Sequence, residues 1–244
     1  MEWPTVTIQI CTYDRYDDIK RTVEALADNL TYPNLEWLIC DDSSPSIYLS
    51  RLKRLKLFRD LNAQFISTET NSGWGSNVNH GLVHIQTPYV FFCEDDYLLE
   101  HTLDLRVGVA VMEAKPIIGM LRYRGTAGDT VVYHQQEADI RPWLPDYHCG
   151  GGVIGKETYL LLDGGSPTLW LYSNGPHLKH CRFHQFYGLY PEGLKLGQTE
   201  EHYCHVVKEG MKRDGAPCIA ILPEWIRMWW SHIGTSYQGT EFDT

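Results

Sequence analysis

The sequence has no apolar run long enough to cross a membrane and no cysteines spaced as CxxC. A bilayer span needs about 18 to 20 consecutive apolar residues, so we expect no transmembrane helix. The seven cysteines are odd in number and widely spaced, and Cys40 and Cys93 lie in apolar runs that favour buried thiols. This usage is typical of a cytoplasmic protein rather than a disulfide-rich secreted domain. Residues 1–9 contain no basic segment followed by an apolar one, so we expect no signal peptide.

Positive charge is also scarce, because 21 Lys and Arg stand against 31 Asp and Glu and give a formal net charge of −10 over 244 residues. Broad nucleic-acid binding requires clustered Lys and Arg, so the balance argues against it. The exception is the basic stretch 51–59, which contains Arg51, Lys53, Arg54, Lys56 and Arg59. It is either the solvated face of a helix or a contact for an anionic partner, such as a membrane surface bound peripherally or a nucleic-acid acceptor.

Short apolar runs alternate with helical periodicity through the first hundred residues. We expect strands at residues 5–11, 36–40, 64–68 and 89–93, and helices at 17–30, 51–61 and 78–85. This alternation predicts an α/β fold with a mostly parallel, Rossmann-like central sheet flanked by helices.

The pattern is looser after about residue 115. Strands are expected at 117–123 and 130–133, paired antiparallel across the turn at 125–129, followed by a helix at 198–209 and a strand at 218–222. No internal repeat or low-complexity linker separates the halves. We therefore expect one domain over residues 1–244, with a smaller mixed or antiparallel C-terminal part from about 116. Nothing in the sequence indicates an oligomeric state.

Polar residues follow the carboxyl ends of the expected strands, the edge at which open α/β sheets bind ligands. These segments are 12–15, 41–42, 71–73 and 94–96. Adjacent carboxylates such as Glu94-Asp95-Asp96 raise one another's pKa. Either a hard divalent cation, Mg²⁺ or Mn²⁺, neutralises them, or they form a solvated acidic turn. The Gly- and Asn-rich segment 71–81 precedes a helix and favours an anionic ligand there, or is a turn with a helix cap.

Taken in order, four segments resemble the motifs of family 2 glycosyltransferases with the GT-A fold. They are VTIQICTYDRYDDIKRTVEAL, LEWLICDDSS, NSGWGSNVNHGL and YVFFCEDDYLLE, within about residues 5–100. The resemblance implies a GT-A glycosyltransferase of the hexosyltransferase type. It implies a nucleotide-diphospho-sugar donor, usually a UDP-sugar, held by Mn²⁺ or Mg²⁺, and inverting transfer to an acceptor hydroxyl.

The resemblance also implies roles for single residues in the first half. The first loop, which cradles the nucleotide, matches Thr12, Tyr13 and Arg15. Either Asp41 or Asp42 matches the carboxylate that contacts the base, and Asn71, Gly73 and Asn79 match the segment that contacts the nucleotide and donor sugar. Residues 94–96 fall on the DxD motif, with Asp95 at the donor and Asp96 as the direct metal ligand. Glu94 replaces the usual first Asp and could reach the ribose or an outer-shell water.

In the second half the matches are fewer. Glu200 and Glu201 fall on the motif that supplies the catalytic base, with Glu201 the first choice and Glu200 left open, and both would also favour a helix N-terminus. His232 matches a C-terminal metal ligand, although a histidine among tryptophans can simply be packed. Gly150, Gly151 and Gly152 resemble the loop that borders the acceptor. Trp170 is a candidate platform for a sugar face.

Two other functions compete with this one. A nucleotidyltransferase on a similar scaffold would need a basic residue near the α-phosphate, where this chain has the acidic TYDRYDD. A sugar-nucleotide-binding module without catalysis would have no use for the carboxylates of both halves. The acceptor is open: a glycan, a lipid-linked acceptor or a modified nucleic acid each fits.

Overall fold

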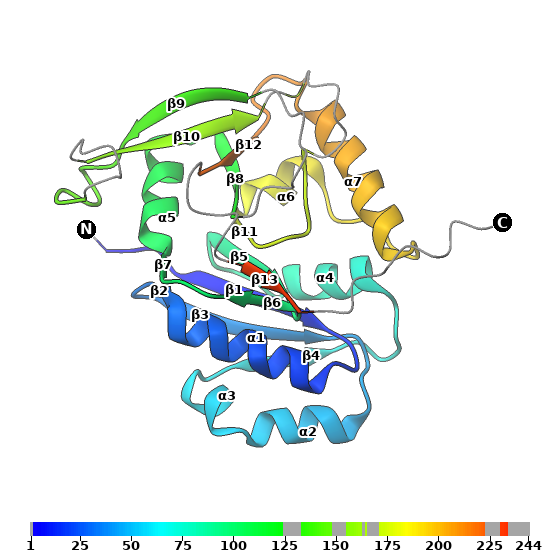
Figure 1. Cartoon of the computed structure of the whole chain (residues 1–244). Coiled ribbons are helices and arrows are strands. Elements are labelled where there is room, and N and C mark those ends of the chain that lie inside the picture. The colour runs from blue at the N-terminus through cyan, green and yellow to red at the C-terminus, as the bar shows by residue number, and fades with distance from the viewer. Residues whose placement is uncertain are drawn as a thin grey trace.

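The computed structural model describes residues 2–123, 133–147, 155–162, 164, 171–222 and 230–233. A central sheet carries helices on both sides (Figure 1). The helices are α1 (Tyr16–Asn29), α2 (Ser46–Arg54), α3 (Lys56–Asp60), α4 (Trp74–Leu82), α5 (Leu105–Ala114), α6 (Arg182–Tyr187) and α7 (Leu196–Gly210). The strands are β1 (Val6–Thr12), β2 (Leu30–Thr31), β3 (Leu35–Asp41), β4 (Gln64–Ser67), β5 (Tyr89–Glu94), β6 (Tyr97–Leu99), β7 (Leu103–Asp104), β8 (Ile118–Arg122), β9 (Tyr133–Asp139), β10 (Lys156–Leu162), β11 (His177–His180), β12 (Cys218–Ile221) and β13 (Trp230–His232).

Within the described ranges the main sheet has nine strands in the order β4-β3-β1-β5-β11-β8-β12-β10-β9. The first four are parallel, and β11 is antiparallel to both of its neighbours, β5 and β8. The parallel N-terminal part and the mixed C-terminal part confirm the expected fold class. The carboxyl ends of β1, β3 and β5 lie together, because these strands are parallel and in register.

The central strands β1, β3 and β5 are buried on both faces, which explains their largely apolar sequences. On one face Ile8 and Ile10 of β1 belong to the same core cluster as Ile19 and Val23 of α1. On the other, Cys11 belongs to the cluster that contains Val78 of α4. Each such aliphatic side chain contributes about 1.5–3 kcal/mol when fully buried, so β1 is anchored by both layers.

Two expectations from the sequence were wrong in detail. The expected helix at 51–61 is interrupted at Leu55, whose extended backbone (ψ 136°) separates α2 from α3. The strand expected at 117–123 does not pair as in the expected hairpin: among the described residues β8 pairs with β11 and β12, and β9 pairs with β10. The turn at 125–129 and residues 130–132 lie outside the described residues. The sequence of β11, HLKH, has no apolar alternation, so its insertion beside β8 left no pattern to recognise.

No helix of the described residues combines the length and the apolar character that a membrane span requires. The cysteines that the structure describes are free thiols.

β11 places a lysine inside the protein. Lys179 is 1% exposed, and its Nζ lies 2.9 Å from His184 Nε2 and 3.0 Å from the Tyr190 hydroxyl. The Tyr190 hydroxyl in turn lies 2.6 Å from that of Tyr172. Burial lowers the pKa of Lys179 to about 7 and lowers the pKa of His184 as well. At a pH above the pKa of Lys179 the lysine is uncharged. The hydrogen bonds of this network then join neutral groups.

We expect the stability of the protein to depend on pH through Lys179. The unfolded chain keeps this proton up to a pKa of about 10.4, whereas the folded protein releases it near 7. Between these values the unfolded state holds more protons, so the free energy of unfolding rises with pH by up to about 1.4 kcal/mol per pH unit. Lys179→Met should therefore be most stable relative to wild type near pH 6 and lose this advantage towards pH 10.

Urea unfolding from pH 6 to 10 measures the effect. Lys156→Met, at an exposed lysine of β10, is the control and should differ from wild type by a constant amount. A pH-independent difference between wild type and Lys179→Met would contradict the expectation.

Candidate functional site

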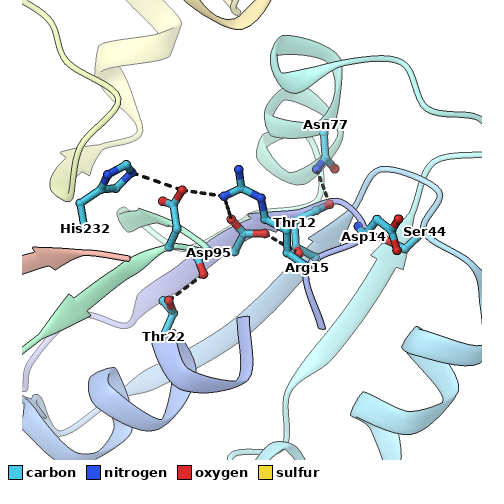
Figure 2. Close-up of polar contacts among 9 residues, drawn as sticks. Thr12, Asp14, Arg15, Thr22, Ser44, Asn77, Asp95 and His232 are labelled. Carbon is cyan, nitrogen blue, oxygen red and sulfur yellow. Dashed lines mark hydrogen bonds and ion pairs between the residues drawn. The ribbon is translucent and has the colours of Figure 1, made fainter. Parts of the chain in front are cut away.

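The carboxylates after β5 are held by residues of β1 and α1. Thr12 Oγ1 donates to Asp95 Oδ2 at 2.6 Å, and Arg15 Nη1 donates to Asp95 Oδ1 at 3.3 Å. Thr22 Oγ1 donates to the backbone carbonyl of Asp95 at 2.8 Å. Figure 2 shows that these contacts reach Asp95 from the end of β1, from the residue before α1 and from α1 itself. Asp95 is thus fixed in both its side chain and its backbone.

Asp96 joins the same site to the C-terminal part of the chain. Its Oδ2 accepts from Arg15 Nη1 at 2.6 Å and lies 3.2 Å from His232 Nε2. β13 pairs antiparallel with β6, with His232 opposite Tyr97, and the Ile233 amide donates to the Asp96 carbonyl at 2.8 Å. Asp96 Oδ1 is buried and has no hydrogen-bond partner. One oxygen of this carboxylate is therefore left for a ligand.

The electrostatics of the cluster are unfavourable in the absence of a ligand. Burial raises the pKa of Asp95 to about 7, although the Thr12 hydrogen bond and the Arg15 charge oppose the shift. Burial, followed by the charges of Asp96 and Glu200, raises the pKa of Glu94 well above its usual range. A bound cation would relieve this repulsion.

The donor set suits a divalent cation that keeps other ligands. Asp96 and His232 bring a carboxylate oxygen and an imidazole nitrogen to one place, and Asp96 Oδ1 has its capacity unused. Across the described residues, no group of three or more His, Cys, Asp and Glu side chains could hold a metal by itself. Mg²⁺ and Mn²⁺ sites commonly combine one or two protein ligands with phosphate oxygens and water, so the residues fit such an ion.

The two aspartates after β3 have different environments. Asp42 accepts hydrogen bonds from the Ser72 amide at 2.9 Å, the Gly73 amide at 2.8 Å and Thr68 Oγ1 at 2.8 Å. Asp42 therefore holds the loop that leads into α4. Asp41 accepts from the Ser44 amide and Ser67 Oγ, but its buried Oδ1 has no partner.

Asp41 also borders a small hollow, of about 10 Å³, at the ends of β1 and β3. The hollow is lined by Thr12, Arg15, Tyr16, Ile19, Asp41, Ser44, Tyr48, Leu49 and Leu52. Of the two aspartates that the sequence left open, Asp41 is the one with an unused oxygen.

The other positions expected near the nucleotide lie around α4. Gly73 precedes the helix with φ 88°, a left-handed value that glycine adopts freely, and Asn71 and Tyr13 are exposed. The Asn79 amide is used within the protein: it donates to the Tyr190 carbonyl at 2.9 Å and to Glu192 Oε1 at 2.8 Å, and accepts from the Tyr190 amide. Asn79 thus ties α4 to residues 190–192.

Glu200 and Glu201, in the first turns of α7, face different surroundings. Glu200 Oε1 accepts from the Asn174 amide at 2.9 Å, and burial raises the pKa of Glu200 although Arg122 lowers it. The charge of Glu200 also raises the pKa of Glu94, so the two carboxylates are close enough to repel one another. Glu201 is exposed.

Sequence reasoning missed three polar residues of this region. Asn77 of α4 donates to the Cys40 carbonyl at 3.1 Å and leaves its Oδ1 buried without a partner. Asn174 Oδ1 and His177 Nε2 are likewise buried without partners. The segment 171–177 has no periodicity. It lies far from Glu200 in the sequence and is brought beside it only by the fold. The acceptor-side residues Gly150, Gly151, Gly152 and Trp170 lie outside the described residues.

We expect Asp42 to be needed for the loop before α4. Asp42→Ala removes the acceptor of four donors, the fourth being Ser72 Oγ at 3.1 Å, and should lower the free energy of unfolding by about 2–4 kcal/mol. Asp17→Ala, at an exposed carboxylate of α1, is the control and should change it by less than about 0.5 kcal/mol. Urea unfolding decides, and equal stabilities of the two variants would refute this role of Asp42.

Comparison with known proteins identifies one sequence family and several solved structures of similar fold. A sequence model for the family described as glycosyl transferase family 2 matches residues 7–179. No curated protein matches the chain. Residues 1–349 of S. aureus TarS, solved with UDP-GlcNAc, superpose with a TM-score of 0.61 at 17% identity, over 96% of this chain and 61% of that one. The match to the longer TarS chain covers 89% of this chain and 35% of that one.

Two further structures are similar. The mannosyltransferase PcManGT from Pyrobaculum calidifontis, solved with GDP-Man and Mn²⁺, has a TM-score of 0.56 at 16% identity, over 90% of this chain and 57% of its own. GalNAc-T7, solved with UDP, GalNAc and Mn²⁺, has a TM-score of 0.60 at 12% identity, over 90% of this chain and 42% of its own. This chain spans about a third to three fifths of the length of these proteins, and the likeness shows a shared fold.

Proposed function

Because the chain belongs to glycosyl transferase family 2 and has the GT-A fold, we propose that it transfers a sugar from a nucleotide-diphospho-sugar to an acceptor hydroxyl. One observation carries the proposal: Arg15, Asp95, Asp96 and His232 converge at the carboxyl end of β5. A UDP-sugar is the favoured donor, supported by the complexes of TarS and GalNAc-T7 with UDP compounds.

In this proposal a divalent cation, Mn²⁺ or Mg²⁺, is held by Asp96 and His232. When bound, such an ion neutralises the charge of the departing nucleoside diphosphate. Support comes from the buried, unpartnered Oδ1 of Asp96 and from the Mn²⁺ in two of the similar structures. Arg15, already within 2.6 Å of Asp96, supplies a fixed positive charge beside the same phosphates. Asp41, with its unused Oδ1, is the carboxylate assigned to the nucleoside.

Glu200 is the residue we assign as the general base. Its charge raises the pKa of Glu94 in the carboxylate cluster, and burial raises the pKa of Glu200 itself, which makes it a stronger base. Glu200 would take the proton of the acceptor hydroxyl as the hydroxyl oxygen attacks the anomeric carbon from the face opposite the diphosphate. The bond to the diphosphate breaks in that step, and the configuration inverts. Exposed Glu201, the first choice from the sequence, has no comparable environment.

Buried acceptors without donors support a sugar ligand. Asn77 Oδ1, Asn174 Oδ1 and His177 Nε2 each lack a hydrogen-bond donor inside the protein. Each such group costs about 1–3 kcal/mol while it is unsatisfied, and a sugar presents several hydroxyl donors. His177 is a neutral acceptor here, because its Nδ1 is engaged with the Gly175 carbonyl at 2.7 Å and burial lowers its pKa.

The two alternative functions explain fewer of these observations. A nucleotidyltransferase would leave Glu200 without a role, and a binding module would not require a base with a raised pKa. The acceptor itself is a hydroxyl of a glycan, a lipid-linked compound or a modified nucleic acid.

Donor binding tests the proposal. In a thermal-unfolding screen of nucleotide-sugars, a UDP-sugar at one hundred times its Kd should stabilise the protein by about 2.7 kcal/mol when Mn²⁺ is present. The gain should fall steeply without the ion and in Asp96→Asn with it. The exposed-site variant Asp60→Asn is the matched control and should respond as wild type does. If no nucleotide-sugar stabilises the protein with Mn²⁺, the proposed function is wrong.

Turnover separates the two glutamates. Glu200→Gln should lower kcat by about 10²- to 10⁴-fold, the loss expected of a missing general base, with little change in donor affinity. Glu201→Gln is the matched control, one residue along the same helix, and should retain nearly full turnover. The opposite ranking would assign the base to Glu201.

A further inference from the structure

A second hollow lies away from the donor site, beside the edge strand β4. Its volume is about 370 Å³, and it is lined by Lys53, Phe58, Arg59, Asn62, Ala63 and Phe65. This volume falls within the usual range of small-molecule sites. Residues 62–65 lie at the start of β4, whereas the donor site lies at the carboxyl ends of the strands, so the two are separate.

The floor of the hollow is apolar and its rim is cationic. Phe58 is 2% exposed, and its ring centroid lies 5.4 Å from that of Phe65. Lys53 Nζ lies 5.5 Å from the centre of the Phe65 ring, and Arg59 and Asn62 are exposed at the opening.

The two cations of the rim lack local compensation. Among the described residues neither Lys53 nor Arg59 forms an ion pair, whereas Lys56 pairs with Asp60 and Arg51 packs over the Tyr16 ring at 4.3 Å. Asp60 is the one carboxylate within residues 46–65, against five basic residues, in a chain of net charge −10. Positive charge is therefore concentrated where the hollow opens.

We propose that this hollow binds a phosphate ester. Lys53 and Arg59 match the two negative charges of a phosphomonoester, and the planar guanidinium can donate two parallel hydrogen bonds to its oxygens. Asn62 adds an amide donor, and the ring of Phe65 offers a flat apolar surface to the esterified group. A bare phosphate ion would leave most of the 370 Å³ unfilled. The inference does not depend on the proposed glycosyl transfer.

Phenyl phosphate, inorganic phosphate and vesicles of phosphatidic acid, a lipid phosphomonoester, in phosphatidylcholine are the probes, used without divalent cations. Calorimetry should detect saturable binding of phenyl phosphate that is tighter than binding of inorganic phosphate. Lys53→Gln/Arg59→Gln should weaken phenyl phosphate binding at least about tenfold. Arg54→Gln/Lys56→Gln makes the same charge change on α2 and α3 at exposed positions outside the hollow, and should weaken it less than about twofold.

Vesicle cosedimentation identifies the source of the phosphate. Binding to phosphatidic acid vesicles that is lost in Lys53→Gln/Arg59→Gln but kept in Arg54→Gln/Lys56→Gln would mean a lipid headgroup. Binding of phenyl phosphate with no binding to the vesicles would mean a soluble phosphate ester. Absence of saturable binding both of phenyl phosphate and of the vesicles would overturn the proposal. Equal weakening by the two double variants would also overturn it, because the basic stretch would then act only as a diffuse charge.

Discussion

The burial of three consecutive carboxylates at the end of β5 is the constraint on which the rest of the site depends. Glu94, Asp95 and Asp96 end a buried central strand, where burial itself raises the pKa of Glu94 and Asp95. The chain compensates from distant segments: Thr12 and Arg15 follow β1, and His232 arrives on β13. The fold thereby collects in one place the groups that a cation and a diphosphate require.

Adjacent aspartates divide two tasks in this site. Asp42 is saturated by donors of the loop before α4, while Asp41 beside it retains an unpartnered Oδ1. Asp95 likewise accepts from Thr12 and Arg15, while Asp96 retains an unpartnered Oδ1. In each pair one carboxylate accepts hydrogen bonds with both of its oxygens, and the other keeps one buried oxygen without a partner among the described residues.

The N-terminal half could be predicted from the sequence because each parallel strand is a continuous apolar run with a helical period after it. The position of β11 could not be, since HLKH owes its place to the neighbours β5 and β8 and to the buried Lys179 network. The same difference holds for the residues of the site. Thr12, Arg15, Asp95 and Asp96 follow strands that the sequence already defined, and their meeting could be expected from the parallel arrangement.

The choice between Glu200 and Glu201 could not be made from the sequence, because it depends on which side of α7 faces Asn174. Two glutamates one residue apart differ by about 100° around a helix, and only the packing of α7 selects one of them. A similar reason applies to Asn77, Asn174 and His177. Neither the composition nor the periodicity of a sequence shows that a polar atom will be buried without a hydrogen-bond partner.

In the proposed site Asp96 and His232 would hold a divalent cation that neutralises the charge of a bound nucleoside diphosphate. Anomalous diffraction from a crystal grown with Mn²⁺ and UDP measures this directly. We predict an anomalous peak in contact with the Asp96 carboxylate, His232 Nε2 and the diphosphate oxygens, with Arg15 beside the same phosphates. A Mn²⁺ peak away from Asp96, or UDP bound there with no metal while Arg15 and His232 keep their contacts to Asp96, would contradict the account.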